Sequence, residues 1–216
     1  MSPGRFITLE GGEGAGKSTQ LALACELIRA AGHEVVATRE PGGTMRAEQI
    51  RSLLLDKTSE PMPATCELLL MFAARATHLE NLIKPSLARG AWVVCDRFTD
   101  ASYAYQGAGR GMSSEHIRAL ETIVQAGLKP DLTLLLDTPA AIGLQRAQQR
   151  NRTQHSAADR FESEHAAFFE RVRNGYLQIA KREPERVRLI DASRPLEQVS
   201  ADVRATLQRF IAGVVL

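Results

Sequence analysis

The stretch GGEGAGKS, residues 11–18, constrains the fold of this chain more than any other part of it. It fits G-x-x-x-x-G-K-[ST], a pattern in which glycines let the backbone turn tightly and point successive N–H groups at phosphate oxygens. The apolar run RFITLE (5–10) precedes it, and a helical pattern from Lys17 to about Ala31 follows it. A strand, a glycine-rich loop and a helix in this order predict a phosphate-binding loop (P-loop).

The rest of the chain alternates strand-like and helical patterns. Besides residues 5–10, strands are expected at 33–40, 91–96, 131–137 and 187–191. Helices are expected at 44–55, 65–88, 113–126 and 140–150. The polar stretch NRTQHSAADR (151–160) follows, and further helices are expected from there to about 182 and from about 195 onward. Pro85 is expected to kink the long helix, and Ser113 or Ser114 to cap the next one. The alternation predicts an α/β fold, with a doubly wound five-stranded parallel sheet flanked by helices, in a single domain over residues 1–216.

Composition narrows the class of protein. The chain of 216 residues has a formal net charge of +2, too small for bulk binding to nucleic acid or membrane. No stretch approaches the ~20 apolar residues of a membrane span, and the N-terminus lacks the long apolar segment of a signal peptide. Cys25, Cys66 and Cys95 lie in apolar stretches without a C-x-x-C pair, which favours buried thiols in a reducing cytosol. We expect a cytoplasmic protein with no nucleic-acid or membrane partner.

The P-loop predicts how donor phosphates are held. Lys17 is expected to reach the β- and γ-phosphates, and the Ser18 hydroxyl to ligate Mg²⁺. Asp96 ends one apolar strand and can assist the metal, while Asp137 ends another and is a rival, although either could cap a turn instead. The residues expected to bind the nucleotide are Gly11, Gly12, Glu13, Gly14, Ala15, Gly16, Lys17, Ser18 and Thr19.

Charged residues near the P-loop indicate where the phosphoryl group goes. Glu13 would repel the donor phosphates if it pointed inward, so it is expected to face a second substrate or to be solvated. Arg39, Arg97 and the arginines of residues 146–160 are expected near the carboxyl ends of the strands, where open α/β sheets bind ligands. The last segment is expected to be a flexible lid over the phosphates, with a solvated basic helix face as the alternative.

An acceptor other than water is favoured. A GTPase would carry the guanine-reading pattern N/T-K-x-D, which the sequence lacks, whereas Arg39, Arg75 and Arg97 could anchor a small phosphorylated acceptor. Phe72 and Arg75 lie three apart on an expected helix and share a face. The ring could therefore stack on a base while the guanidinium bonds the edge of that base. Packing of Phe72 in the core is the alternative.

Together these residues resemble the bacterial thymidylate kinases. The matching segments run from Phe6 to Glu162 in the family's order and are FITLEGGEGAGKST, TREPGGT, ELLLMFAAR, DRFTDASYAYQGAGRG, PDLTLLLD and DRFE. The resemblance implies a P-loop nucleoside monophosphate kinase fold with a lid, a homodimer, and Mg²⁺-dependent transfer of the ATP γ-phosphoryl group to dTMP, giving dTDP for dTTP biosynthesis. The alternatives are another nucleoside monophosphate kinase, acting on dUMP or CMP, and a non-catalytic ATP-binding protein.

The resemblance also implies roles for individual residues. Arg97 would hold the acceptor phosphate beside the donor, Arg39 would contact the same phosphate, and Arg75 would bond the thymine edge. The other residues implied in substrate binding are Glu13 on the dTMP side, Phe72 against the base, Ser102 and Gln106 near the base or sugar, Tyr105 beneath C2′, and Glu162 near the sugar 3′-hydroxyl.

The family supplies an assisting arginine either from the P-loop or from the lid. The P-loop interior, Gly12 to Ala15, contains no arginine, so the chain resembles the lid-arginine type. Arg150 is the first candidate and Arg152 the second. These two arginines join Lys17 and Arg97 as the expected catalytic residues.

Two features depart from the family pattern. Many members place the stacking aromatic four residues before the thymine-reading arginine, and here that position is Met71. The lid, at about residues 146–160, is also longer and more polar than the family pattern implies.

Overall fold

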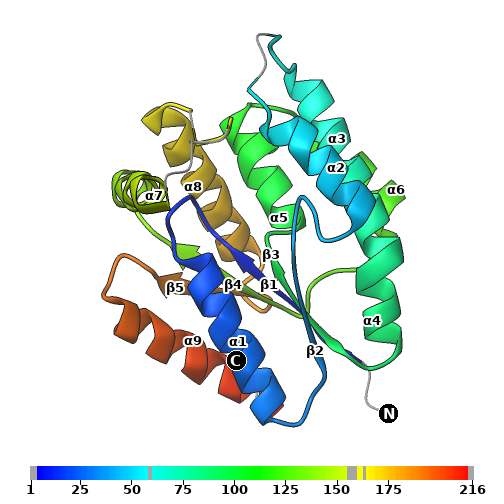
Figure 1. Cartoon of the computed structure of the whole chain (residues 1–216), viewed down its shortest axis with the longest axis vertical. Helices are drawn as coiled ribbons and strands as arrows, with labels where there is room; N and C mark the ends of the chain where they lie inside the picture. The colour runs from blue at the N-terminus through cyan, green and yellow to red at the C-terminus, as the bar shows by residue number, and fades with distance from the viewer. Residues whose placement is uncertain (1–3, 58–59, 155–159, 163, 214–216) are drawn as a thin grey trace.

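A five-stranded, all-parallel sheet forms the centre of the molecule (Figure 1). The computed structural model describes residues 4–57, 60–154, 160–162 and 164–213. The strands are β1 (Phe6–Glu10), β2 (Val35–Arg39), β3 (Trp92–Asp96), β4 (Leu132–Asp137) and β5 (Val187–Asp191), in the spatial order β2-β3-β1-β4-β5. The predicted sheet is confirmed, and the P-loop follows its central strand.

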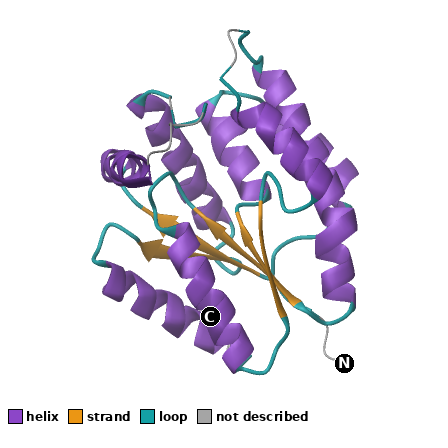
Figure 2. Cartoon of the chain, in the orientation of Figure 1, coloured by secondary structure: helices purple, strands orange, loops and turns teal. Residues whose placement is uncertain are grey.

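Helices cover both faces of the sheet (Figure 2). On one face lie α1 (Lys17–Ala30) and α9 (Leu196–Ile211), which pack against each other. The helices on the side of the opposite face are α2 (Met45–Leu55), α3 (Ala64–His78), η1 (Leu79–Ile83), α4 (Lys84–Ala88), α5 (Thr99–Ser102), η2 (Tyr103–Gly109), α6 (Ser114–Gln125) and α8 (Ala166–Arg182). The remaining helix, α7 (Ala140–Gln154), packs against α8.

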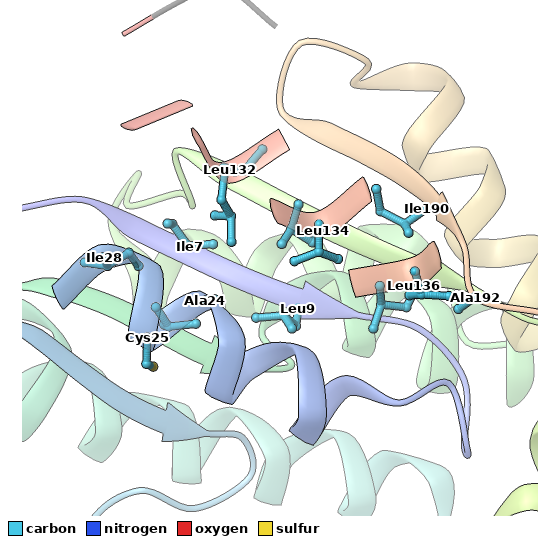
Figure 3. Packing of buried hydrophobic residues seen from close by; sticks show 14 of the residues in the cluster. Ile7, Leu9, Ala24, Cys25, Ile28, Leu132, Leu134, Leu136, Ile190 and Ala192 are labelled. Atoms are coloured by element: carbon cyan, nitrogen blue, oxygen red, sulfur yellow. The ribbon is translucent and has the colours of Figure 1, made fainter. Parts of the chain in front are cut away.

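Alternation of side chains along the strands builds a separate core on each face. Ile7 and Leu9 of β1 pack with Leu132, Leu134 and Leu136 of β4 under helix α1 (Figure 3). The intervening strand positions pack into the clusters of the opposite face. Because both faces are covered, the inner strands β3 and β4 are nearly continuous apolar runs. Each fully buried aliphatic side chain stabilises the fold by about 1.5–3 kcal/mol.

Side-chain caps fix two helix starts. The Thr44 hydroxyl accepts a hydrogen bond from the Ala47 N–H at 3.4 Å, and the Ser113 hydroxyl accepts one from the Glu115 N–H at 3.2 Å. Ser113, and not Ser114, is therefore the N-cap of α6.

The expected helix at residues 65–88 is not one regular α-helix. Its middle, Leu79–Ile83, is a π-helical segment between α3 and α4, and the Lys84 N–H bonds the carbonyl of Leu79. Pro85 follows directly at the start of α4, where its missing N–H would have interrupted an α-helical ladder. The sequence therefore produces a wider turn before the proline, which is a correction to the expected kink at Pro85 itself.

Helices α5 and η2, over residues 99–109, were not expected. Gly107 and Gly109 lower the helical tendency of this segment, so local propensity favours a loop. Close packing against α8 overrides it. A Cβ on Gly109 would lie 2.6 Å from the Phe168 ring, and one on Gly175 would lie 2.8 Å from the Cβ of Ala108. The glycines thus let the two helices approach closely.

Two further expectations are corrected. Cys25 and Cys95 are buried, but Cys66 is exposed because it lies in the solvent-facing first turn of α3. Helix α7 continues to Gln154 rather than ending near Arg150, so the first part of the predicted lid is helical. Within the described part of the chain, the helices lack the length and apolar character needed to cross a membrane.

Candidate active site

The backbone of the P-loop needs its glycines. Gly11 and Gly14 have φ of 136° and 67°, and a Cβ on them would lie 2.3 Å from the Leu136 carbonyl oxygen and 2.0 Å from the Gly143 carbonyl oxygen. Gly16 has φ of 86° and open space where a Cβ would be. The loop is therefore held tightly against β4 and α7 on one side and is open on the other.

Lys17 starts helix α1 and turns back into the loop. Its ammonium donates hydrogen bonds to the carbonyl oxygens of Gly12 at 2.8 Å and Gly11 at 3.2 Å. Burial and the nearby Arg97 lower the pKa of Lys17, against the opposing influence of Asp96 and the nearby glutamates. The ammonium is thus placed where phosphates would lie, at the N-terminus of a helix.

A cavity of about 440 Å³ joins the P-loop to helices α3 and α5. The expected site residues that line it are Glu13, Gly14, Ala15, Gly16, Lys17, Ser18, Thr19, Arg39, Arg75, Asp96, Arg97, Ser102, Tyr105, Arg150 and Glu162. Residues from distant segments therefore meet at the carboxyl end of the sheet, where parallel α/β sheets bind ligands.

Arg97 lines this cavity and is held by several partners. Its guanidinium donates to Glu13 Oε1 at 2.6 Å and to the Gly11 carbonyl at 2.6 Å, and it lies 4.8 Å from the ring centroid of Tyr105. The Tyr105 hydroxyl donates to the same Glu13 oxygen at 3.0 Å. Burial alone would raise the pKa of Glu13, but Arg97, Lys17 and the Tyr105 hydroxyl outweigh it and lower the pKa to about 2. Glu13 is therefore an anion that holds Arg97.

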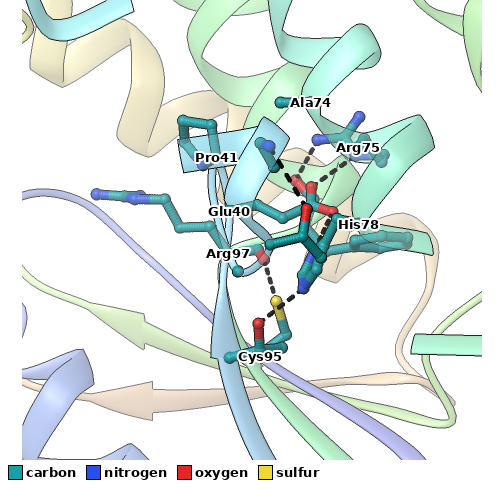
Figure 4. Close-up of polar contacts among 12 residues, drawn as sticks. Glu40, Pro41, Ala74, Arg75, His78, Cys95 and Arg97 are labelled. Atoms are coloured by element: carbon teal, nitrogen blue, oxygen red, sulfur yellow. Dashed lines mark hydrogen bonds and ion pairs between the residues drawn. The ribbon is translucent and has the colours of Figure 1, made fainter. Parts of the chain in front are cut away.

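Arg75 is fixed from several sides (Figure 4). Its Nε donates to Glu40 Oε2 at 2.7 Å, and its Nη2 donates to the Phe98 carbonyl and the Ser102 hydroxyl, both at 3.1 Å. The other Glu40 oxygen contacts His78 Nδ1 at 3.0 Å. Among the described residues, the buried Nη1 of Arg75 has no hydrogen-bond partner. A rigid guanidinium with a free donor at a cavity wall is suited to reading a polar edge.

The end of helix α7 carries the expected lid arginines. Arg150 pairs with Glu162 at 2.5 Å, and Asn151 donates to the other Glu162 oxygen at 2.8 Å. Arg146 lines the cavity and donates to the carbonyl oxygens of Ala192 and Ser193. Residues 155–159 of the expected lid lie outside the described residues. Arg150 thus reaches the cavity from a helix rather than from a loop.

Comparison with known proteins identifies the family to which this architecture belongs. The family model described as thymidylate kinase matches residues 9–203. The chain belongs to the thymidylate kinase family. It is 58% identical over 214 residues to the thymidylate kinase of Chromohalobacter salexigens and 54% identical over 213 residues to that of Methylococcus capsulatus, covering 99% of each chain in both cases.

A solved structure agrees with this placement. The crystal structure of thymidylate kinase from Ehrlichia chaffeensis superposes with a TM-score of 0.75 at 34% sequence identity, covering 96% of this chain and 100% of that one. The expected P-loop nucleoside monophosphate kinase fold is thereby confirmed.

Of the two candidate aspartates for a metal, the structure favours Asp96. Its buried Oδ1 has no hydrogen-bond partner among the described residues, and the residue lines the cavity with Ser18. Asp137 is instead held by Arg173, which donates to its two oxygens at 2.7 and 2.9 Å. An unpartnered carboxylate oxygen and a hydroxyl that line the same cavity fit the oxygen ligands that Mg²⁺ prefers.

Several expected site residues do not line the cavity of this thymidylate kinase family member. Phe72 is only 2% exposed, packs with Leu68 and Ile117, and has its ring centroid 4.5 Å from the Arg75 guanidinium, so stacking on a base is not supported. Met71, the residue directly before Phe72 on α3, lines the cavity instead.

The other residues away from the cavity wall have different surroundings. Gln106 is fully buried and donates to Glu67 at 2.8 Å, so its expected place near the base or sugar is also not supported. Arg152 is exposed on α7 and does not line the cavity. Gly11 and Gly12 contribute carbonyl oxygens to the bonds of Lys17.

Two buried carboxylates that hold residues of the site were not predicted from the sequence. Glu40 lies within TREPGGT but was assigned no role, and Glu10 ends the apolar run before the P-loop. Both are nearly inaccessible to solvent, at 5% and 0% exposure. A carboxylate that ends an apolar strand is a usable signal, because burying a charge is costly unless partners compensate it. The partners on α3 and α8, His78 and Tyr176, gave no comparable signal.

Proposed function

We propose that this protein transfers the γ-phosphoryl group of ATP to dTMP, giving dTDP, and so serves dTTP biosynthesis. The observation that carries the proposal is the single cavity that joins the P-loop to Arg75, whose Nη1 has no hydrogen-bond partner among the described residues. Membership of the thymidylate kinase family supports the choice of thymidylate as acceptor.

The donor side is the P-loop, Gly11 to Thr19. Its open face and the helix start at Lys17 would hold the ATP phosphates. Ser18 and Asp96 would hold Mg²⁺, which neutralises charge on the β- and γ-phosphates.

The acceptor side lies across the same cavity. Arg97 and the half-exposed Arg39 would bind the dTMP phosphate, and the free donor of Arg75 would bind the thymine edge. Other residues in the acceptor pocket would be Glu13 and Ser102, Tyr105 beneath the sugar, Met71 against the base, and Glu162 near the 3′-hydroxyl.

The chemical step needs positioning more than proton transfer. The dTMP phosphate dianion is already a nucleophile, so no general base is assigned. Lys17, Arg97 and a lid arginine would hold the two phosphates in line and offset the charge that develops between them. Arg150 is the first candidate for the lid arginine because it lines the cavity, and Arg152 is the second. We propose that the chain is a single domain over residues 1–216 and that residues 146–160 are its lid.

The proposal is tested by coupled ADP release with ATP and each nucleoside monophosphate in turn, with and without Mg²⁺. We expect turnover with dTMP that is lost when EDTA removes Mg²⁺. Comparable or faster turnover with dUMP or CMP would overturn the assignment of the base. A single methyl group discriminates by about 1–3 kcal/mol, so some dUMP turnover is compatible with the proposal. No turnover with any acceptor would favour a non-catalytic ATP-binding protein.

We also propose a homodimer, formed through α2, α3 and α6. Helix α3 packs beside both α2 and α6, and these helices present Met45, Leu53, Leu69 and Ile123 to solvent at 53–83% exposure. Exposed apolar side chains gathered on neighbouring helices are typical of an interface.

Charge placed on this surface is expected to dissociate the dimer. Leu69→Asp with Ile123→Asp should give a monomer in sedimentation equilibrium, because two carboxylates from each protomer would be buried without partners. Leu196→Asp is the control, since Leu196 is 58% exposed on α9, on the other face of the sheet. A dimer that survives the double substitution would contradict this interface.

A cytoplasmic location is a further proposal. Cys25, Cys66 and Cys95 are all free thiols, as expected in a reducing compartment.

A further inference from the structure

The backbone of Arg97 adopts an unfavourable conformation. Its φ of 69° lies in the left-handed region, which a residue with a Cβ adopts only where its surroundings hold it. The Arg97 N–H still donates to the Leu9 carbonyl at 2.9 Å, so the turn begins at the last hydrogen bond between β3 and β1. Contacts outside the sheet must therefore hold the turn that follows.

Glu10 supplies that contact from the end of the neighbouring strand β1. Its Oε1 accepts the Phe98 N–H at 2.7 Å, directly after the Arg97 turn, and the residue has no solvent exposure. Its Oε2 accepts the Tyr176 hydroxyl at 2.8 Å. Each oxygen of this fully buried carboxyl group thus has a hydrogen-bond donor, as a buried polar group requires.

Tyr176 reaches Arg97 from helix α8 on the other side. Its hydroxyl donates to Glu10 and accepts from Arg97 Nη1 at 3.3 Å, and the residue is 3% exposed. The same Nη1 donates to the Gly11 carbonyl at 2.6 Å. The guanidinium is therefore held between the P-loop and a hydroxyl that is itself fixed by Glu10.

We propose that Glu10 and Tyr176 are positioning residues for Arg97 in phosphoryl transfer. Glu10 holds the main chain after the Arg97 turn, and Tyr176 holds the guanidinium that binds the acceptor phosphate. The proposal rests on the proposed function, because it assigns these residues to a step of that reaction. Neither residue lines the cavity, so both act through Arg97 and not on substrate.

Tyr176→Phe removes only the hydroxyl. We expect kcat/KM for dTMP to fall about tenfold, since hydrogen bonds to charged groups are lost, while KM for ATP stays within twofold. Tyr103→Phe is the matched control. The Tyr103 hydroxyl donates a hydrogen bond of 2.6 Å to Glu121, and neither residue lines the active-site cavity. This variant should therefore retain wild-type turnover.

A double-mutant cycle separates positioning from a general structural role. In an Arg97→Lys background, Tyr176→Phe should change kcat/KM by less than twofold, because the guanidinium that it orients is gone. A structural role elsewhere would give the same tenfold factor in both backgrounds. Glu10→Gln is the second variant. It disturbs the bond that fixes the Tyr176 hydroxyl, so the part of its effect that acts through Tyr176 on the guanidinium should likewise shrink in the Arg97→Lys background.

The outcomes are distinguishable. If the wild type phosphorylates dTMP and both Tyr176→Phe and Glu10→Gln stay within twofold of it, the positioning role is wrong. Equal losses in both backgrounds would also overturn it. If the wild type does not phosphorylate dTMP, the proposed function fails and this inference fails with it.

Discussion

Replacing Arg97 with alanine should lower kcat/KM for dTMP by about 10³–10⁵, the range found for arginines that offset charge on a transferred phosphoryl group. The guanidinium lies between Glu13 and the Gly11 carbonyl, at the junction of the donor and acceptor sides. Alanine carries a Cβ like arginine, so the left-handed backbone at this position is no more strained than before. We expect a folded protein that binds ATP and transfers phosphate poorly.

Coupled ADP release with ATP and dTMP measures this loss, and thermal melting checks the fold. Arg97→Lys should be intermediate, because lysine keeps the charge but loses the planar fork of donors. The matched control is Arg89→Ala. Arg89 also pairs with a carboxylate, Glu34, but both side chains are about half exposed and lie outside the cavity. Near-normal turnover in Arg97→Ala would contradict the role assigned to Arg97.

Replacing Glu67 with alanine should cost about 3–5 kcal/mol of unfolding free energy, because it breaks a buried ionic cluster. Glu67 is 1% exposed on α3 and accepts the Gln106 amide at 2.8 Å. It also pairs with Arg110 at 3.1 Å and with Arg160 at 2.7 Å. Without the carboxylate, two guanidinium groups and a fully buried amide lose their shared acceptor.

Urea unfolding at one fixed protein concentration measures this cost, since a dimer makes stability depend on concentration. Glu80→Ala is the matched control. Glu80 continues the same helical path in η1 and pairs with Lys84, but that glutamate side chain is 64% exposed. Exposed pairs of this kind contribute about 0–1 kcal/mol. Equal costs in the two variants would show that the Glu67 cluster does not stabilise the fold.

The features predictable from the sequence are those encoded locally. The P-loop glycines, the buried strands and the cap at Ser113 each depend on neighbours within a few residues, and the structure contains them all. Helices α5 and η2 escaped prediction because their stability comes from packing on α8, which lies over fifty residues further along the chain.

The cavity was predictable in part for the same reason. Arg75 and Arg97 were expected at the acceptor side and both line the cavity. Met71 and Phe72 are adjacent on α3, and the spacing of each to Arg75 did not show which of the two lines the cavity. The contact of Glu10 with Tyr176 joins residues 166 positions apart, a distance at which no sequence pattern acts. The roles of these residues in binding and transfer are still predictions.

The glycines between η2 and α8 have a mechanical consequence. Gly109 packs against the Phe168 ring and Gly175 packs against Ala104 and Ala108, so little side-chain volume separates the two helices at these positions. Helix η2 carries Tyr105 of the acceptor wall, and α8 begins just beyond the lid segment. Because closely packed helices tend to move together, a displacement of α8 would also shift Tyr105 in the acceptor wall.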